Sequence, residues 1–147
     1  MLNLNDKAFE YFRMINPIEH SKTKEAANKY KVEPYVVAAD IYGAGNLAGR
    51  GGWTWYTGSS SWMFVAGLKY ILGINMENGI LRIEPHVPSN WENYSVRFKF
   101  GESLYNVKII RAENVNEKKF MINGENVSES QIQLDGSGKI FNIVVDI

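Results

Sequence analysis

A glycine-rich, aromatic stretch carries the residue types best suited to binding chemistry in this chain. From Gly49 to Trp62 it reads Gly-Arg-Gly-Gly-Trp-Thr-Trp-Tyr-Thr-Gly-Ser-Ser-Ser-Trp. The glycines allow positive φ angles and let another group approach the backbone closely. Trp53 and Trp55 offer flat faces with a polar N–H at one edge. A backbone that bends freely beside rigid aromatic faces suits the binding of a sugar.

A helix is predicted directly after this stretch, over about 60–72. Thr57 or Ser59 can cap its start. The first turn of a helix leaves N–H groups without partners and carries the positive end of the helix dipole. Such an end suits a phosphate group. For Thr57, capping without any ligand is an equally good interpretation.

The other polar and aromatic residues near this stretch have structural interpretations as well. Tryptophans such as Trp53 and Trp55 serve in cores and interfaces more often than as sugar platforms. Arg50 can face an anion or form a salt bridge with Glu33 or Asp40. Glu33 can equally act as a favourable charge at the start of a helix. These alternatives stay open on sequence grounds.

Composition excludes several classes of protein. The 147 residues, 45% hydrophobic and 13% aromatic, suffice for a packed core in one domain or two small pieces. Sixteen basic residues balance sixteen acidic ones, so we expect neither nucleic acid nor a membrane surface as partner. No cysteine and two distant histidines argue against a metal site. The absence of a signal-peptide pattern and of a long apolar run predicts a soluble, cytoplasmic protein.

The first half of the chain reads as short helices. A helix is predicted over 6–15, ended by Asn16-Pro17, followed by a helical turn over 24–28. Residues 32–42 favour a helix of about two turns, with a buried strand as the alternative, because a short apolar run does not settle the period. The helix over 60–72 is apolar on nearly all sides, and Gly73 suits its C-terminal cap. Such a helix needs other helices to cover it.

After Gly73 the hydrophobic period changes to two. Short strands are predicted over 79–85, 96–100, 104–111, 119–122, 131–134 and 140–145. Turn residues separate them at Gly101-Glu102, Asn123-Gly124 and Asp135-Gly136. Regular short strands of this kind indicate an antiparallel sandwich or part of a jelly roll. The fold class is therefore α+β.

Several blocks of this sequence resemble one known family in order and spacing. They are residues 32–40 (Val-Glu-Pro-Tyr-Val-Val-Ala-Ala-Asp), 49–58 (Gly-Arg-Gly-Gly-Trp-Thr-Trp-Tyr-Thr-Gly), Trp62-Met63, 70–74, 81–85 and 88–91. They resemble the C-terminal part of the inverting glycoside phosphorylases of glycoside hydrolase family 94, formerly glycosyltransferase family 36. The chitobiose and β-1,2-oligoglucan phosphorylases and the C-terminal region of cyclic β-1,2-glucan synthases look nearest. The ten-residue glycine block makes this far more specific than a lone glycine motif.

The resemblance implies a fold and a reaction. Residues 1–77 would be the last helices of an incomplete (α/α)6 catalytic barrel, and residues 78–147 a C-terminal, jelly-roll-like antiparallel β-sandwich. In this family an aspartic acid protonates the glycosidic oxygen of a β-linked sugar while inorganic phosphate attacks the anomeric carbon, giving a sugar 1-phosphate. Phosphate is then a co-substrate, and no other cofactor is expected.

The resemblance also assigns roles to residues. Thr57 and Gly58 match the family's phosphate-binding threonine and glycine, while the general acid, an arginine and a histidine belong upstream of this sequence. Arg50, Trp53, Trp55 and Glu33 are candidates for contacting sugar or shaping the site. No catalytic residue is therefore expected in the chain, and we expect no turnover by the chain alone.

Two classes of function follow. In the first, the chain is a C-terminal fragment that binds β-linked oligosaccharide and phosphate within a complete enzyme, with a homodimer partner or a complementing N-terminal segment. In the second, it is a stand-alone carbohydrate-binding or assembly module that uses exposed aromatic residues of the sandwich. The candidates for that surface are Trp91, Tyr94 and Tyr105. The helix over 60–72 favours the first class, because it is apolar on nearly all sides and needs other helices to cover it.

Overall fold

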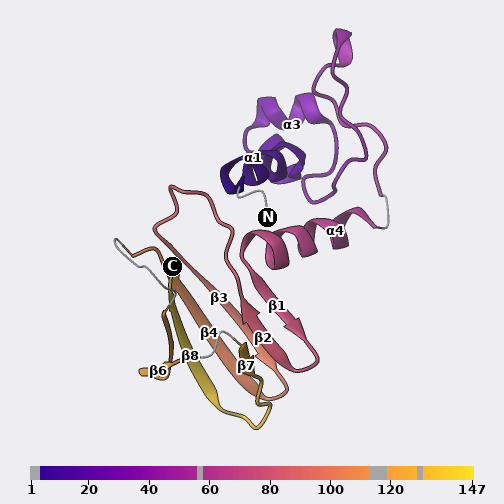
Figure 1. Ribbon diagram of the computed structural model, residues 1–147. Coiled ribbons are helices and arrows are strands. Elements are labelled where there is room, and N and C mark those ends of the chain that lie inside the picture. Colours follow the sequence, from indigo (N-terminus) through magenta and orange to yellow (C-terminus); the bar gives the residue numbers. More distant parts are fainter. Residues whose placement is uncertain (1–3, 56–57, 113–118, 129–130) are drawn as a thin grey trace. The chain divides into compact units, whose positions relative to one another are not determined.

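The structure is a computed structural model that describes residues 4–55, 58–112, 119–128 and 131–147 (Figure 1). The chain divides into two compact units, a helical unit that ends at Ile71 and a β unit that begins at Leu72. Within the described residues, no helix is long and apolar enough to cross a membrane. The α+β class predicted from the sequence is confirmed.

The helical unit is built from short helices. They are α1 (Asn5–Ile15), α2 (Pro17–His20), α3 (Lys24–Tyr30), the 3₁₀ turn η1 (Gly45–Leu47), α4 (Ser59–Val65) and its π-helical continuation η2 (Ala66–Ile71). Local chemistry sets their starts: Asn16 caps α2 by accepting a hydrogen bond from the Ile18 N–H at 3.0 Å, and Thr23 caps α3. The predicted helices over 6–15 and 60–72 and the helical turn over 24–28 are confirmed.

The segment over 32–42 is neither the helix nor the strand that we predicted. It forms a turn and extended backbone, with one antiparallel bridge between Ile41 and Gly51. Its backbone groups bond to the glycine-rich stretch: the Ala39 N–H donates to the Trp53 carbonyl at 2.8 Å, and the Tyr42 N–H to the Arg50 carbonyl at 2.9 Å. Pairing with a distant segment therefore replaces the local hydrogen bonds of a helix.

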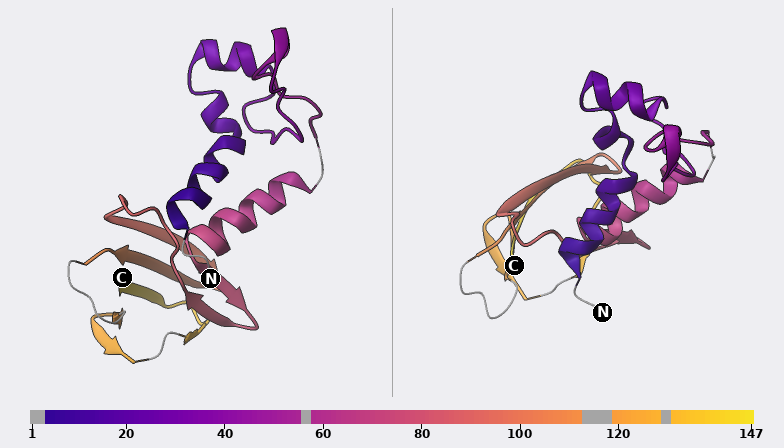
Figure 2. Two further views of the ribbon diagram at one scale, coloured as in Figure 1. Left: turned by 45° about the horizontal axis from the view of Figure 1, so that its top comes forward. Right: turned by 90° about the horizontal axis from the view of Figure 1, so that it is seen from above.

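The helical unit buries few large side chains. Its buried hydrophobic residues are Tyr30, Val36 and Ile71 within the described part. In contrast, Trp62 is 74% exposed and Phe64 66% exposed on α4. Helix α1 packs on η2 (Figure 2). Phe12 lies against Gly67 there, and the rings of Trp62 and Phe64 stay uncovered. The expectation that this helix needs a covering surface agrees with these exposures.

The β unit contains two sheets. One is three-stranded and antiparallel, in the order β1 (Ile74–Glu77), β2 (Ile80–Ile83) and β7 (Gln131–Gln133). The other is five-stranded, in the order β3 (Asn93–Phe100), β4 (Ser103–Ile110), β8 (Ile140–Asp146), β5 (Lys119–Ile122) and β6 (Glu125–Val127). Most predicted strands and the turns at Gly101-Glu102 and Asn123-Gly124 are present.

Two features of the β unit differ from the expectation. Strands β4 and β8 pair in parallel, so the larger sheet is mixed, because β7 joins the other sheet before the chain returns as β8. In addition, β1 and β6 are strands that the sequence analysis missed. Because β1 pairs with β2, residues 74–77 belong to the β unit rather than to the helices. The boundary between the units lies after Ile71, whereas the sequence analysis placed it after residue 77.

Tyr105 organises the core of the β unit. It is fully buried, and its ring stacks between Phe98 and Phe141, with centroids 5.1 and 4.7 Å away. Its hydroxyl donates to the Asp135 carbonyl at 3.0 Å and accepts from the Asp135 N–H at 2.7 Å. Lys139 donates to the Asp135 carboxylate and holds its pKa at about 2. Tyr105 thus helps to hold the loop from β7 to β8, together with the buried Ser103 hydroxyl, which accepts from the Gly138 and Lys139 N–H groups.

We predict that Tyr105→Phe lowers the free energy of unfolding by about 1–3 kcal/mol, because the Asp135 N–H loses its partner in a half-buried place. Chemical denaturation of the chain measures this. Tyr11→Phe, the same change at an exposed ring, is the control. Equal stability of the two variants would contradict the role given to the Tyr105 hydroxyl.

Candidate functional site

The glycine-rich stretch lies against Tyr30 and residues 31–42. The Gly51 N–H donates to the Tyr30 carbonyl at 2.9 Å, and the Gly52 N–H donates to the Asp40 carbonyl at 2.9 Å. A Cβ atom at Gly51 would collide with the Val32 side chain, and one at Gly52 with the Asp40 carboxylate. Glycine is needed at Gly51, where the neighbouring side chains are packed, whereas at Gly52 the exposed Asp40 side chain could move aside.

A hollow of about 430 Å³ opens beside these glycines. Its lining includes the side chains of Lys31, Tyr42, Arg50, Trp53 and Thr54. In the part of the chain that the structure describes, neither Lys31 nor Arg50 forms an ion pair. The salt bridge from Arg50 to Glu33 or Asp40 is therefore absent, and two exposed cations border the hollow. Together they can attract an anionic or hydroxyl-rich ligand.

An exposed aromatic cluster lies on the same stretch. The Trp55 Nε1–H donates to the Glu33 Oε1 at 3.2 Å, and the Tyr35 ring meets Trp55 edge-on with centroids 6.2 Å apart. Trp55 has a φ of 64°, which is unusual for a bulky residue and is often found at functional sites. Trp53 and Trp55 are 72% and 64% exposed, so neither lies in the core. Of the roles considered for these rings, an interface with another protein surface and a platform for a ligand are left.

The residues of this cluster also correct the interpretation of Glu33. No helix begins beside it, so its carboxylate does not serve a helix start. It instead holds the indole of Trp55 by a hydrogen bond. Tyr35 and Lys31 were not singled out from the sequence. Their place in the candidate site depends on tertiary contacts with the glycine-rich stretch, which no local sequence motif predicts.

The predicted phosphate site is described only in part. Thr57 lies outside the described residues, so its phosphate role stays a prediction. Gly58 is the N-cap of α4 and is exposed, and among the described residues no side chain accepts a capping hydrogen bond there. Ser59 is the first helical residue rather than the cap, and the Ser61 hydroxyl donates to the Gly58 carbonyl at 2.9 Å. The helix start at Gly58 is thus accessible to an anion.

Comparison with known protein families places both units in one class, the carbohydrate-active enzymes. Residues 1–73 match the model described as "Glycosyl hydrolase 94 superfamily, catalytic domain". Residues 74–120 match "Glycosyl hydrolase family 65, C-terminal domain". Together the two matches cover residues 1–120, and the chain corresponds to the C-terminal part of a glycoside phosphorylase of the glycosyl hydrolase 94 and 65 type. The resemblance seen in the sequence is thereby confirmed.

Curated relatives point the same way. The chain is 45% identical over 118 residues to the cyclic beta-(1,2)-glucan synthase NdvB of Rhizobium meliloti. The aligned region is 80% of this chain and 4% of NdvB. It is 25% identical over 147 residues to the N,N'-diacetylchitobiose phosphorylase of Vibrio furnissii, covering 98% of the chain and 18% of the relative. Solabiose phosphorylase of Paenibacillus borealis is 27% identical over 135 residues, 90% of the chain and 16% of the relative. The chain spans less than a fifth of the length of these relatives.

We predict that Gly51→Ala lowers the free energy of unfolding of the helical unit by about 1–3 kcal/mol, because the added methyl overpacks against Val32 and Tyr30. Tryptophan fluorescence during denaturation is a suitable readout, since Trp53 and Trp55 follow directly. Gly43→Ala is the control, because a Cβ at Gly43 meets nothing within 4 Å. If both variants unfold alike, the close packing at Gly51 is not what holds the stretch.

Proposed function

We propose that this chain supplies the sugar-facing loop and part of the phosphate site of a β-glycoside phosphorylase. The general acid of that enzyme would lie in sequence N-terminal to these residues, as the family resemblance implies. The chain alone would then produce no sugar 1-phosphate. The family match of residues 1–73 and the phosphorylases among the relatives support this proposal.

The observation that carries the proposal is the Trp55–Glu33 pair. The hydrogen bond to Glu33 orients the Trp55 ring, while the ring itself is left open to solvent. An oriented, exposed indole can cover the apolar C–H face of a sugar. The second carboxylate oxygen of Glu33 can accept a hydrogen bond from a sugar hydroxyl. A sugar site requires aromatic rings of fixed orientation and hydrogen-bond acceptors at fixed positions.

The proposed reaction divides its demands between two parts of the enzyme. Protonation of the leaving oxygen needs a carboxylic acid, which this chain is not proposed to supply. Phosphate is already an anion and mainly needs positioning opposite the leaving group. The exposed helix start at Gly58 and the cations Lys31 and Arg50 can contribute that positioning. The chain would therefore bind the oligosaccharide and help to position the phosphate.

The exposed rings of α4 fit the same proposal. Trp62 and Phe64 lie uncovered on a helix whose apolar side chains need a partner surface. The remaining helices of an (α/α)6 barrel would provide it. In a chain isolated from those helices, association with a second copy could cover the same rings. The proposed partners are thus β-linked oligosaccharide and phosphate in the complete enzyme, and protein at the helix surface.

The alternative of a stand-alone module loses the aromatic surface on which it relied. Tyr105 is buried in the core. Tyr94 is half-buried, and its hydroxyl donates to the Leu72 carbonyl at 2.5 Å. The Trp91 ring packs edge-on against Tyr94 with centroids 5.8 Å apart. These three rings do not form an open platform for a sugar.

In the complete enzyme, we predict that Trp55→Ala raises the KM for oligosaccharide about tenfold, a loss of about 1.4 kcal/mol, and leaves phosphate affinity nearly unchanged. Thr57→Ala should do the reverse and weaken phosphate binding more than sugar binding. Steady-state kinetics with each substrate varied separately measure both.

Ser128→Ala, at an exposed position in the β unit, is the control for these two variants. Equal losses for sugar and phosphate in either variant would rule out the division of roles proposed here.

A further inference from the structure

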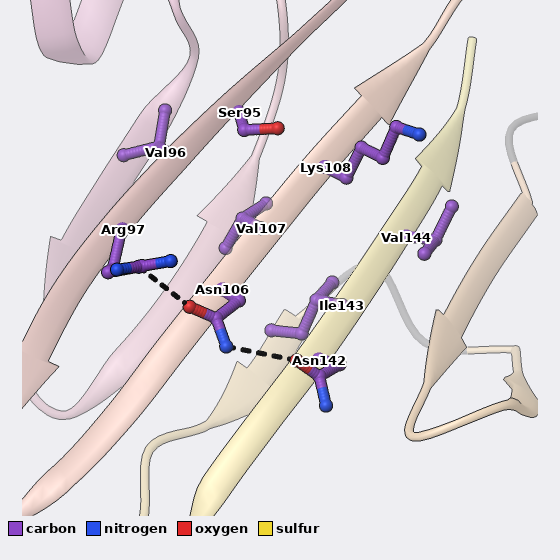
Figure 3. A pocket seen from close by; sticks show the side chains of 9 residues that line it. All are labelled: Ser95, Val96, Arg97, Asn106, Val107, Lys108, Asn142, Ile143 and Val144. Atoms are coloured by element: carbon purple, nitrogen blue, oxygen red, sulfur yellow. Dashed lines mark hydrogen bonds between the residues drawn. The ribbon is translucent and has the colours of Figure 1, made fainter.

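A second hollow lies on the β unit, away from the glycine-rich stretch in sequence. It measures about 610 Å³ and runs across β3, β4 and β8 (Figure 3). The side chains of Ser95, Arg97, Asn106, Lys108, Asn142 and Val144 stand on this outer face, and they alternate with the core residues of the same strands. The function proposed above makes no use of this face.

Three polar side chains form a directed row across the hollow. The Arg97 Nε–H donates to the Asn106 Oδ1 at 3.0 Å, and the Asn106 Nδ2–H donates to the Asn142 Oδ1 at 2.9 Å (Figure 3). A guanidinium can only donate, so Asn106 must turn its oxygen toward it. The amide nitrogen of Asn106 must then face β8, and Asn142 must present its oxygen in turn. One cation therefore sets the orientation of both amides.

Apart from the Ser95 hydroxyl, the polar side-chain groups left over in the hollow are donors. They are the remaining N–H groups of Arg97, the Asn142 amide nitrogen and the Lys108 ammonium. Arg97 and Lys108 are exposed, and among the described residues neither forms an ion pair. No carboxylate lines the hollow. A fitting ligand must therefore be rich in acceptors and negatively charged.

The geometry narrows the ligand further. No aromatic ring lines the hollow, so neither a nucleic-acid base nor the apolar face of a neutral sugar finds a stacking surface. The donors recur from strand to strand at about 4.8 Å. A ligand with acceptors repeated along its length can engage several strands at once, as a linear glycan can.

We propose that this face binds an anionic oligosaccharide, one that carries carboxylate groups along its chain. The negative charge follows from the donors and cations of the hollow. The choice of a saccharide over another polyanion rests on the carbohydrate function proposed above. The face would hold the glycan through Arg97 and Lys108, while the amide row contacts its hydroxyls.

The test is an amide-shift titration of the full chain with a galacturonate oligosaccharide, followed by calorimetry at two salt concentrations. We expect shifts on β3, β4 and β8, and an affinity that falls as salt rises. Arg97→Gln and Lys108→Gln should each weaken binding about threefold to tenfold. Lys24→Gln, the same loss of charge on exposed α3, should leave it unchanged. In the Arg97→Gln variant, the glutamine amide can still donate to Asn106, so the row survives.

Two further probes make the outcome decisive. Equal binding of single-stranded oligo(dT) or polyglutamate would overturn the saccharide assignment, and an absence of shifts on these strands would overturn the site itself. Binding that Lys24→Gln weakens as much as Arg97→Gln would also overturn it. A neutral β-1,2-gluco-oligosaccharide that shifts Trp53 and Trp55 instead reports on the function proposed above, so the two proposals can fail separately.

Discussion

The candidate site depends on the close packing of Gly51 against Tyr30. The Gly51 N–H bonds to the Tyr30 carbonyl, and a side chain at Gly51 would collide with Val32. Because the two segments approach this closely, residues 31–42 can pair with the glycine-rich stretch and bring Glu33 to Trp55. An oriented ring in an exposed place is therefore a consequence of a buried glycine.

Part of this architecture was readable from the sequence. Helix ends and hairpin turns depend on neighbouring residues, so Asn16-Pro17 and Asn123-Gly124 were readable locally as the end of α1 and a hairpin turn. The cap at Thr23 and helix α2 were not predicted. The extended form of residues 32–42 and the parallel pairing of β4 with β8 depend on distant segments, and neither was predicted. The role of the glycine-rich stretch as a binding site stays a prediction, whereas the contact of Glu33 with Trp55 required the structure.

The two units present different chemistry. The helical unit exposes rings, from Trp53 to Phe64, that suit sugar faces and apolar partners. The outer face of the larger sheet exposes the donors of Arg97 and Lys108 without any ring. Tyr105, which the sequence offered as a surface ring of the sandwich, instead fills the core of the β unit. The two proposed sites would thus differ in mechanism, with ring stacking on the helical unit and charge on the β unit.

The most direct test of the central claim joins two readouts on the purified chain: a phosphate titration followed by the amide shifts of Gly58 to Ser61, and an assay for glucose 1-phosphate with β-1,2-gluco-oligosaccharide and phosphate. A part of a phosphate site without its general acid predicts shifts and no product, since general acid catalysis typically contributes ~10²–10⁴-fold. Formation of glucose 1-phosphate by the chain alone, or the absence of any phosphate response, would contradict the account.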